Sequence, residues 1–388
     1  MASDSETLQL FLTTIRRFVR ERLIPLEQQV DETDHIPEEL ISEMKEMGLF
    51  GLSIPEEFGG IGLTLSEEVL VVQELGYTAP AFRTTFGTNV GIGSQGILID
   101  GTAEQKQKYL PKLASGEIVG SFALTEPEAG SDAGSVTTSA RREGDTYILN
   151  GTKRFITNAT RAGVFTVMAR TGSTEDKARG ISAFLVDADT PGIELGKPEK
   201  KMGMKGVQCC DVIFNDVVVS KDQIIGGVEG QGFKTAMKVM DRARLHISAL
   251  SVGIAKRLID EATLYATGRK QFGQQISEFQ LIQAMIADSQ AEYLASKSMV
   301  EATATKYDLG EQVSQDASCC KLFCTEAVGR IADRAVQIHG GSGYISDYAV
   351  ERFYRDVRLL RLYEGTTQIQ QLVIARSVIK NAEQIELG

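Results

Sequence analysis

The placement of proline constrains the fold of this chain more than any other feature of its sequence. All eight prolines lie at or before Pro198, so residues 199–388 contain none. Proline interrupts a helix because its nitrogen carries no hydrogen and its ring clashes with the preceding turn. The second half of the chain can therefore form long helices, and we expect it to fold differently from the first half.

Apolar residues in the proline-free half recur at the spacing of an α-helix. Ile247, Leu250, Ile254 and Leu258 follow one another at steps of three and four residues, which places them on one helical face. Further helices are predicted at residues 280–307, 314–337 and 366–382, with breaks at Gly310 and around Gly340. Four helices joined by short connections indicate a helical bundle.

Between about residues 121 and 222 the pattern changes to short strands. Stretches rich in β-branched and aromatic residues alternate with Gly, Pro, Asp and Ser, which is typical of strands joined by turns. These stretches are residues 164–170, 181–186 and 211–219. The dipeptide Asn150-Gly151 lies between two further apolar stretches and predicts a hairpin turn.

The chain is therefore predicted to be mainly α with a central β domain. Residues 1–120 show helical spacing again, so we expect an N-terminal helical domain over 1–120, a middle β domain over 121–228 and a C-terminal helical bundle over 229–388. This order differs from the alternating βαβ pattern of a dinucleotide-binding sheet, and no GxGxxG motif follows a strand. A nucleotide cofactor would have to be held in another way.

Charge and hydropathy exclude several classes of protein. The 41 Lys and Arg against 52 Asp and Glu give a net charge of −11, which argues against binding to nucleic acid through a broad cationic surface. No apolar run approaches the roughly 20 residues of a membrane-spanning helix. The N-terminus carries neither an export signal nor a transit-peptide pattern, so a cytoplasmic protein without membrane contact is expected.

Cysteine and histidine give no indication of a metal site. The five cysteines have neither a disulfide-framework pattern nor a zinc-ligand spacing, and we expect reduced thiols. The three histidines lie far apart in the sequence, and His246 and His339 are interpreted as structural residues.

Five short segments along the chain carry the chemical information. They are residues 55–60 (PEEFGG), 123–132 (ALTEPEAGSD), 269–273 (RKQFG), 337–341 (QIHGG) and 363–366 (YEGT). In composition and in order they resemble the landmarks of the acyl-CoA dehydrogenase family, and the resemblance covers essentially the whole chain. It implies an N-terminal helical domain, a middle β-barrel-like domain and a C-terminal four-helix bundle, usually assembled as a homotetramer.

The resemblance also implies an activity. The family carries out FAD-dependent α,β-dehydrogenation of an acyl-CoA thioester to the trans-2-enoyl-CoA, as in β-oxidation of fatty acids. A proton leaves the α carbon, a hydride leaves the β carbon for flavin N5, and an electron-transferring flavoprotein takes the electrons. Such chemistry needs a base, donors to the thioester oxygen, and a flavin held against the acyl chain.

The resemblance assigns the base to Glu364. By itself this residue reads as a loop glutamate in a surface ion pair, and the matched string YEGTTQIQ favours the catalytic interpretation. Some family members carry the base one residue before the arginine that matches Arg244, but this chain has Ala243 there. Gly365 leaves room for the substrate to approach the backbone.

The cofactor residues implied by the resemblance fall into three groups. The flavin ring and nearby phosphates are assigned to Leu124, Thr125, Ser131, Phe155 and Thr157, where Phe155 stands in place of the usual tryptophan. The diphosphate and the adenylate half, which a neighbouring subunit cradles, are assigned to Arg269, Phe272, Gln280, Gln337 and Gly341. Further FAD contacts are assigned to Thr366 and Gln368.

Substrate contacts are assigned to Ser131, Gly365, Asp241 and Arg244, the last two at the predicted start of the long helix. Arg83 matches the arginine with which glutaryl-CoA dehydrogenases hold a second carboxylate. A buried guanidinium needs an anionic partner, which could be a dicarboxylyl substrate, Glu74 or another internal carboxylate.

Two alternatives to an acyl-CoA dehydrogenase stay open. A flavin oxidase or monooxygenase can use the same scaffold, but such relatives tend to lack the glutamate that Glu364 matches. A flavin-containing relative that binds nucleic acid needs a basic surface, which the net charge of −11 disfavours. The sequence does not fix the length or branching of the acyl chain.

Overall fold

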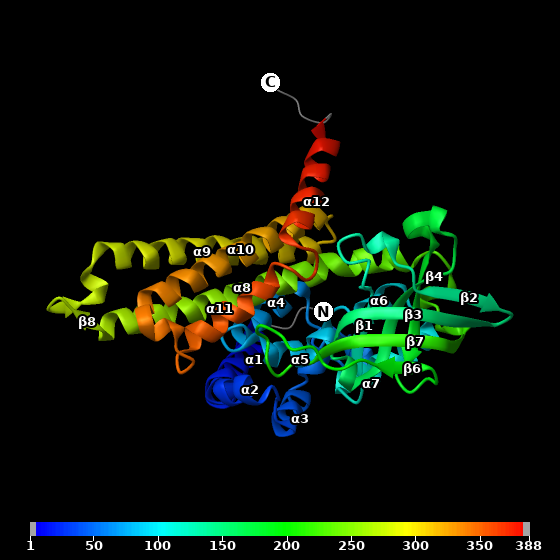
Figure 1. Cartoon of the computed structure of the whole chain (residues 1–388), viewed down its shortest axis with the longest axis horizontal. Helices are drawn as coiled ribbons and strands as arrows, with labels where there is room; N and C mark the ends of the chain where they lie inside the picture. The colour runs from blue at the N-terminus through cyan, green and yellow to red at the C-terminus, as the bar shows by residue number, and fades with distance from the viewer. Residues whose placement is uncertain (1–4, 383–388) are drawn as a thin grey trace.

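The computed structural model describes residues 5–382, in which an N-terminal group of helices and a β-sheet lie against a long C-terminal bundle (Figure 1). The N-terminal helices are α1 (Ser5–Phe18), α2 (Glu27–Thr33), α3 (Glu38–Glu46), α4 (Leu65–Leu75), α5 (Pro80–Val90), α6 (Gln95–Asp100) and α7 (Ala103–Ser115). Capping boxes fix the starts of α4 and α7: Thr64 pairs with Glu67, and Thr102 pairs with Gln105. The predicted helical character of this region is confirmed.

The middle of the chain forms a seven-stranded sheet. Its strands are β1 (Val119–Ala123), β2 (Ser139–Glu143), β3 (Thr146–Thr157), β4 (Ala162–Arg170), β5 (Ile181–Asp187), β6 (Ile193–Leu195) and β7 (Cys209–Ser220). They follow the order β1-β4-β2-β3-β7-β6, and β5 pairs with β4. The three predicted strands at 164–170, 181–186 and 211–219 are confirmed as parts of β4, β5 and β7.

The predicted hairpin at Asn150-Gly151 is wrong. Strand β3 runs straight through this dipeptide, and its ladder with β7 is only shifted between Leu149 and Gly151. The Asn150 side chain bonds Asp216 on β7 at 3.0 Å, which keeps the residue in the sheet. The turn that does form a hairpin joins β2 to β3 at Gly144, whose φ of +62° suits a glycine.

The C-terminal helices are α8 (Gly232–Gly268), α9 (Gln280–Asp308), α10 (Ser314–His339), α11 (Ala349–Leu360) and α12 (Thr367–Lys380). The predicted stripe of Ile247, Leu250, Ile254 and Leu258 lies in the core of α8 against α9, α10 and α11. A small hairpin of β8 (Lys270–Gln271) and β9 (Gln274–Gln275) connects α8 to α9.

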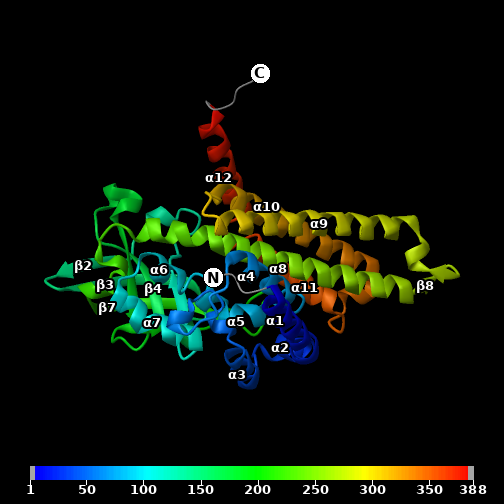
Figure 2. The same cartoon turned by 180° about the vertical axis from the view of Figure 1, so that it is seen from behind.

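The bundle differs from the prediction in its fourth helix. We expected the helix at 366–382 to complete the bundle, but α12 projects away from it, as both views show (Figures 1 and 2). The unpredicted helix α11 packs along the bundle instead, with Val350, Phe353, Val357 and Leu360 buried in the common core. This places the turn between α11 and α12 beside the bundle rather than at its end.

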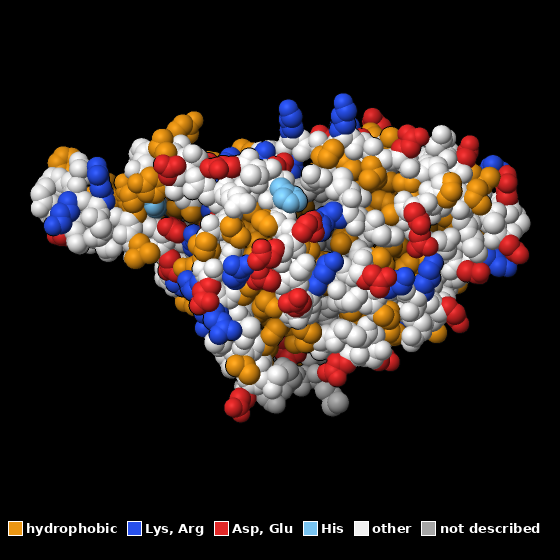
Figure 3. Space-filling model, turned by 90° about the horizontal axis from the view of Figure 1, so that it is seen from below, with side chains coloured by type: hydrophobic (Ala, Val, Ile, Leu, Met, Phe, Trp, Pro, Cys, Tyr) orange, Lys and Arg blue, Asp and Glu red, His pale blue; other side chains and the backbone are white. Residues whose placement is uncertain are grey.

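The surface of the molecule carries charged side chains of both signs. On the face seen in Figure 3, acidic and basic side chains are interspersed without a continuous basic area. Within residues 5–382, no helix combines the length and the apolar character needed to cross a bilayer.

Candidate active site

Glu364 lies in the short turn between α11 and α12. It is half-buried, and its backbone has a φ of +54°. This value lies in the left-handed region, which residues other than glycine seldom adopt. Gly365 follows with a φ of +86°. The carbonyl oxygens of this turn are bonded from two sides, since Gln370 Nε2 donates to those of Glu364 and Gly365, both at 3.0 Å, and Lys321 Nζ donates to that of Gly365 at 2.8 Å.

Two opposing effects act on the Glu364 carboxyl. Burial raises its pKa, and the positive charges of Arg244, Arg83 and Lys321 lower it. Burial prevails, so the pKa of Glu364 lies above its ordinary value. A carboxylate made less stable in this way is a stronger base, as general-base chemistry near neutral pH requires.

Arg244 and Asp241 form a pair on α8. Arg244 Nη1 donates to Asp241 Oδ1 at 3.0 Å, and the other Asp241 oxygen accepts from the hydroxyl of Ser314. The expectation that these residues open the helix is wrong, because α8 begins at Gly232. Arg244 is nevertheless close enough to Glu364 to lower the carboxyl pKa.

Arg83 on α5 is buried, and it lies near the turn between α11 and α12 that carries Glu364. Its Nη2 lies 2.8 Å from His246 Nδ1, and its charge acts on Tyr363 and Glu364. The suggested partner Glu74 is wrong, because that residue pairs with Arg16. A Cβ at position 87 would lie 2.6 Å from Arg83 Nη1, so Gly87 makes the space that the guanidinium occupies.

His246 joins Arg83 to a buried carboxylate. Its Nε2 lies 3.1 Å from Glu68 Oε2, and the Glu68 carboxylate also accepts from Arg242. Burial lowers the pKa of His246, which favours the neutral ring. A neutral ring with its hydrogen on Nε2 accepts from Arg83 at Nδ1 and presents its N–H on the side of Glu68.

The loop that follows β1 is braced by a buried ion pair. Lys153 Nζ donates to Glu126 at 2.8 Å and to the carbonyl of Leu124 at 3.1 Å. The Glu126 carboxylate also accepts from the backbone of Thr137 and Thr138. Against the effect of burial, Lys153 and these donors lower the pKa of Glu126 to about 2, so it is ionised.

A bulge in β3 presents Phe155. The β3–β7 ladder shifts between Lys153 and Ile156, and Phe155 has a φ of +57° and a side chain 55% exposed. Bulges commonly redirect a side chain beside a binding site. Leu124, Thr125 and Thr157 are half-buried, whereas Ser131 is exposed.

The residues assigned to the adenylate half lie elsewhere. Arg269 ends α8, Phe272 is 94% exposed on the β8–β9 hairpin, and Gln280, Gln337 and Gly341 are exposed at the same end of the bundle. Helices rise about 1.5 Å per residue, so Arg269 lies about 37 Å from Arg244 along α8. The predicted adenylate residue Arg269 therefore lies far along α8 from the predicted substrate residue Arg244.

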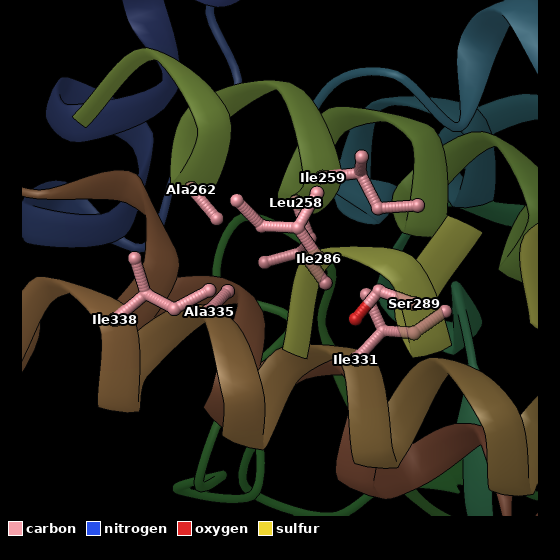
Figure 4. Close-up of a pocket in the computed structure, with 8 residues that line it drawn as sticks. All are labelled: Leu258, Ile259, Ala262, Ile286, Ser289, Ile331, Ala335 and Ile338. Carbon is pink, nitrogen blue, oxygen red and sulfur yellow. The ribbon is translucent and has the colours of Figure 1, made fainter. Parts of the chain in front are cut away.

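A small cavity in the bundle is unrelated to the turn of Glu364. It lies between α8, α9 and α10 and is lined by Leu258, Ile259, Ala262, Ile286, Ser289, Ile331, Ala335 and Ile338 (Figure 4). The hydroxyl of Ser289 donates a hydrogen bond to the carbonyl oxygen of Met285 at 2.7 Å. With no other polar side chain in its lining, the cavity reads as a packing gap.

Three family models match the chain in succession. They are the N-terminal, middle and C-terminal domains of acyl-CoA dehydrogenase, matched at residues 5–117, 121–217 and 230–379. The 3-(aryl)acrylate reductase of Clostridium sporogenes is 41% identical over 376 residues, covering 97% of this chain and 99% of its own. The chain belongs to the acyl-CoA dehydrogenase family.

Other members of the acyl-CoA dehydrogenase family differ in the activity their names give. The caffeyl-CoA reductase–Etf complex subunit CarC of Acetobacterium woodii is 40% identical, covering 91% of this chain and 92% of its own. The structure of butyryl-CoA dehydrogenase from Megasphaera elsdenii has a TM-score of 0.93 and 34% identity, covering 98% and 100%. The family thus includes proteins named as dehydrogenases and as reductases.

Acyl-CoA dehydrogenase family proteins bind FAD. A structure of the family from Bacillus anthracis, complexed with FAD, has a TM-score of 0.91 and 34% identity to this chain, covering 98% of this chain and 68% of its own. The exposed Phe155 ring on its bulge and the adjoining Leu124–Thr125 backbone suit a flat, polar-edged ring system. The residues present therefore fit the flavin.

Sequence reasoning missed Lys321 and Gln370, which bond the turn of Glu364. It also missed Glu68 and the contact of His246 with Arg83, which lie behind that arginine. A signal existed for Lys321, which interrupts the apolar stripe of Ala317, Cys324 and Val328 on α10, because a lysine on a buried helical face needs an acceptor.

Proposed function

We propose that the protein interconverts an acyl-CoA thioester and its trans-2-enoyl-CoA, with Glu364 as the base that takes the α proton. The observation that carries this proposal is the half-buried carboxyl of Glu364, with a raised pKa, among Arg244, Arg83 and Lys321. The backbone N–H of Glu364 is proposed to donate to the thioester oxygen. Asp241, Arg244, Ser131 and Gly365 are proposed to contact the substrate.

FAD is proposed to lie against Leu124, Thr125, Ser131, Phe155 and Thr157, with Thr366 and Gln368 as further contacts. When bound, it accepts the hydride from the β carbon. The protein's own part is to position the thioester, to exclude water and to hold the proton on the Glu364 carboxyl.

The direction of the reaction has two candidates. Oxidation with transfer of electrons to an electron-transferring flavoprotein is the function that the family resemblance favours. Reduction of an enoyl-CoA is the second candidate, because relatives at 40–41% identity are named as reductases and one as part of an Etf complex. The same base serves both directions, since the α proton is removed in one and returned in the other.

A panel of thioesters tests the activity. Under anaerobic conditions, saturated acyl-CoAs of short, long, branched, aryl and dicarboxylic type are expected to bleach the bound flavin if they are substrates. The corresponding enoyl-CoAs are expected to restore the colour of the dithionite-reduced protein. If no thioester changes the flavin in either direction, the proposed function is wrong.

Arg83 supports a carboxylated acyl chain as the substrate. Its bonded partner is the neutral His246 ring, and its Nε is buried without a hydrogen-bond partner. The guanidinium charge is thus not cancelled by a directly bonded carboxylate, and a second carboxylate on the substrate would match it.

The cofactor is proposed to be shared between two copies of the chain. In the group of Arg269, Phe272, Gln280, Gln337 and Gly341, the first residue lies about 37 Å along α8 from Arg244, which acts on the Glu364 carboxyl. These residues would therefore hold the adenylate half of the FAD in a neighbouring subunit. Such sharing favours a homo-oligomer, and a tetramer is the family expectation.

A further inference from the structure

The turn that carries Glu364 is held in a conformation that it would not adopt by itself. A glutamate in the left-handed region is strained by an amount on the order of 1 kcal/mol, and the strain persists only where the surroundings enforce it. Gly365 extends the left-handed path by one residue. Neighbouring groups must therefore fix both peptide units.

We propose that Lys321 and Gln370 are positioning residues that hold the Glu364–Gly365 backbone, and that Lys321 also places a positive charge beside the turn that carries Glu364. This inference rests on the proposed function, because it concerns the same base. Both residues come from neighbouring helices, Lys321 from α10 and Gln370 from α12, and the side chains of both are completely buried.

The contacts form a clamp on consecutive carbonyl groups. Gln370 Nε2 bonds the carbonyl oxygens of residues 364 and 365 at 3.0 Å each, and Lys321 Nζ bonds the second at 2.8 Å. A Cβ at position 365 would lie 2.6 Å from Gln370 Nε2, so the glycine is needed for the amide to approach. Glu326 on α10 supports the turn from outside through Thr367 at 2.6 Å and Arg361 at 3.1 Å.

Three cations act on Glu364 from three elements. Arg83 on α5 is bonded to His246 and Arg244 on α8 is paired with Asp241, whereas Lys321 on α10 bonds the turn itself. The buried Tyr363 hydroxyl is a further titratable neighbour of Glu364, and the charges of Glu326 and Asp241 act on Lys321 and Arg244 in turn. Burial lowers the pKa of Lys321 to about 8, so it carries its charge at neutral pH.

A purely structural role would affect stability alone, whereas the proposed role changes the acidity of the base. Removing the Lys321 charge makes the Glu364 carboxylate less stable, so its pKa rises and ionisation is shifted to higher pH. Removing the Gln370 amide loosens the turn without changing any charge. The two substitutions are therefore expected to differ in their pH profiles.

The experiment uses the FAD-loaded protein and measures the anaerobic rate of flavin bleaching by butyryl-CoA, or by the most effective thioester of the panel, as a function of pH. Lys321→Met and Gln370→Met are each expected to slow bleaching on the order of tenfold to a hundredfold. The rising limb of the profile moves to higher pH in Lys321→Met and stays in place in Gln370→Met. Lys306→Met is the matched control, because that lysine is exposed on α9 and paired with Asp316.

A second measurement does not depend on activity. Hydrogen exchange of the backbone amides in residues 361–370 is expected to be faster in both variants than in the wild type and unchanged in Lys306→Met. Wild-type exchange together with a wild-type pH profile in Lys321→Met would overturn the inference. Should Lys321→Met not fold, a wild-type bleaching rate and wild-type exchange in Gln370→Met would overturn the clamp by themselves. If no thioester bleaches the wild-type flavin, the proposed function fails, while the exchange data still decide whether the clamp exists.

Discussion

At the scale of single residues, the site is a balance between burial and charge around Glu364. Burial raises the pKa of this carboxyl, and three cations from separate elements oppose the effect without cancelling it. A group arranged in this way is less stable when ionised than it would be in the unfolded chain. The fold therefore gives up some stability in order to hold a base.

This balance predicts a stability effect of Glu364→Gln with a defined sign. The folded pKa of Glu364 is raised, so ionisation destabilises the native state once the pH exceeds the ordinary pKa of a glutamate. The variant cannot ionise and is expected to have a higher Tm than the wild type at neutral and alkaline pH. In acid, where the wild-type carboxyl is protonated in both states, the difference should disappear. A lower Tm of the variant at alkaline pH would contradict the burial argument.

Arg83 predicts a difference between two kinds of thioester. Arg83→Met is expected to reduce kcat/KM for glutaryl-CoA by about tenfold or more relative to its effect on butyryl-CoA, since a charge-assisted bond is worth about 1.5–3 kcal/mol. Gln95→Met, a change of a buried polar residue on α6 that bonds Ser53, is a control for general effects on the fold. Equal small changes for both thioesters in Arg83→Met would remove the idea of a carboxylated substrate.

Some of these residues were accessible from the sequence, and others were not. The motif around Glu364 indicated this residue as the proposed base, because the residues of the motif are contiguous. The contacts of Lys321, Gln370, His246 and Glu68 depend on how α4, α8, α10 and α12 meet, which no local pattern encodes.

At the scale of elements, the helices and strands that could be predicted were those with strong periodicity. The stripe of α8 and the β-branched strands β4, β5 and β7 were found because their patterns repeat over several residues. The dipeptide Asn150-Gly151 was mistaken for a hairpin turn. Turn propensity alone cannot reveal that Asn150 bonds across to β7 and that the ladder between β3 and β7 continues on both sides of it. Helix α11 was missed, and α12 was placed in the bundle in its stead.

One prediction at the scale of elements concerns the buried ion pair of Lys153 and Glu126, which braces the loop that follows β1. Lys153→Met leaves the Glu126 carboxylate buried without its cation, and we expect a loss of about 3–5 kcal/mol in the free energy of unfolding. Weaker retention of FAD should accompany it, because Lys153 also bonds Leu124 in the loop proposed to hold the flavin. Denaturant unfolding and flavin release on dilution measure the two effects.

Lys221→Met serves as the control for this change. Lys221, which follows β7, is paired with Asp145, which precedes β3, and such exposed pairs contribute about 1 kcal/mol or less. A loss in Lys153→Met no greater than in Lys221→Met would show that the brace is not needed.

At the scale of the whole molecule, Arg269, which follows the last residue of α8, lies far along that helix from Arg244. The distance of about 37 Å between Arg244 and Arg269 follows from the length of α8 between them, and the sequence pattern had placed the start of that helix near Asp241. A symmetric pair of chains would bring the far end of each bundle to the flavin site of the other.

Complementation between two defective variants tests this arrangement. Chains carrying Glu364→Gln and chains carrying Arg269→Met are each expected to be inactive or weak when expressed separately. In a mixed pair, one of the two sites combines an intact Glu364 with an intact Arg269, so co-expression should restore activity. No recovery in isolated mixed oligomers would contradict sharing of the cofactor.

Glu364 is proposed to remove or return the α proton. The most direct test compares the wild type with Glu364→Gln, both loaded with FAD, by mixing each anaerobically with a thioester that bleaches the wild-type flavin. We expect the variant to keep its yellow colour and to bleach about a hundredfold to ten-thousandfold more slowly, as removal of a general base predicts. Bleaching of the variant at the wild-type rate would contradict the account.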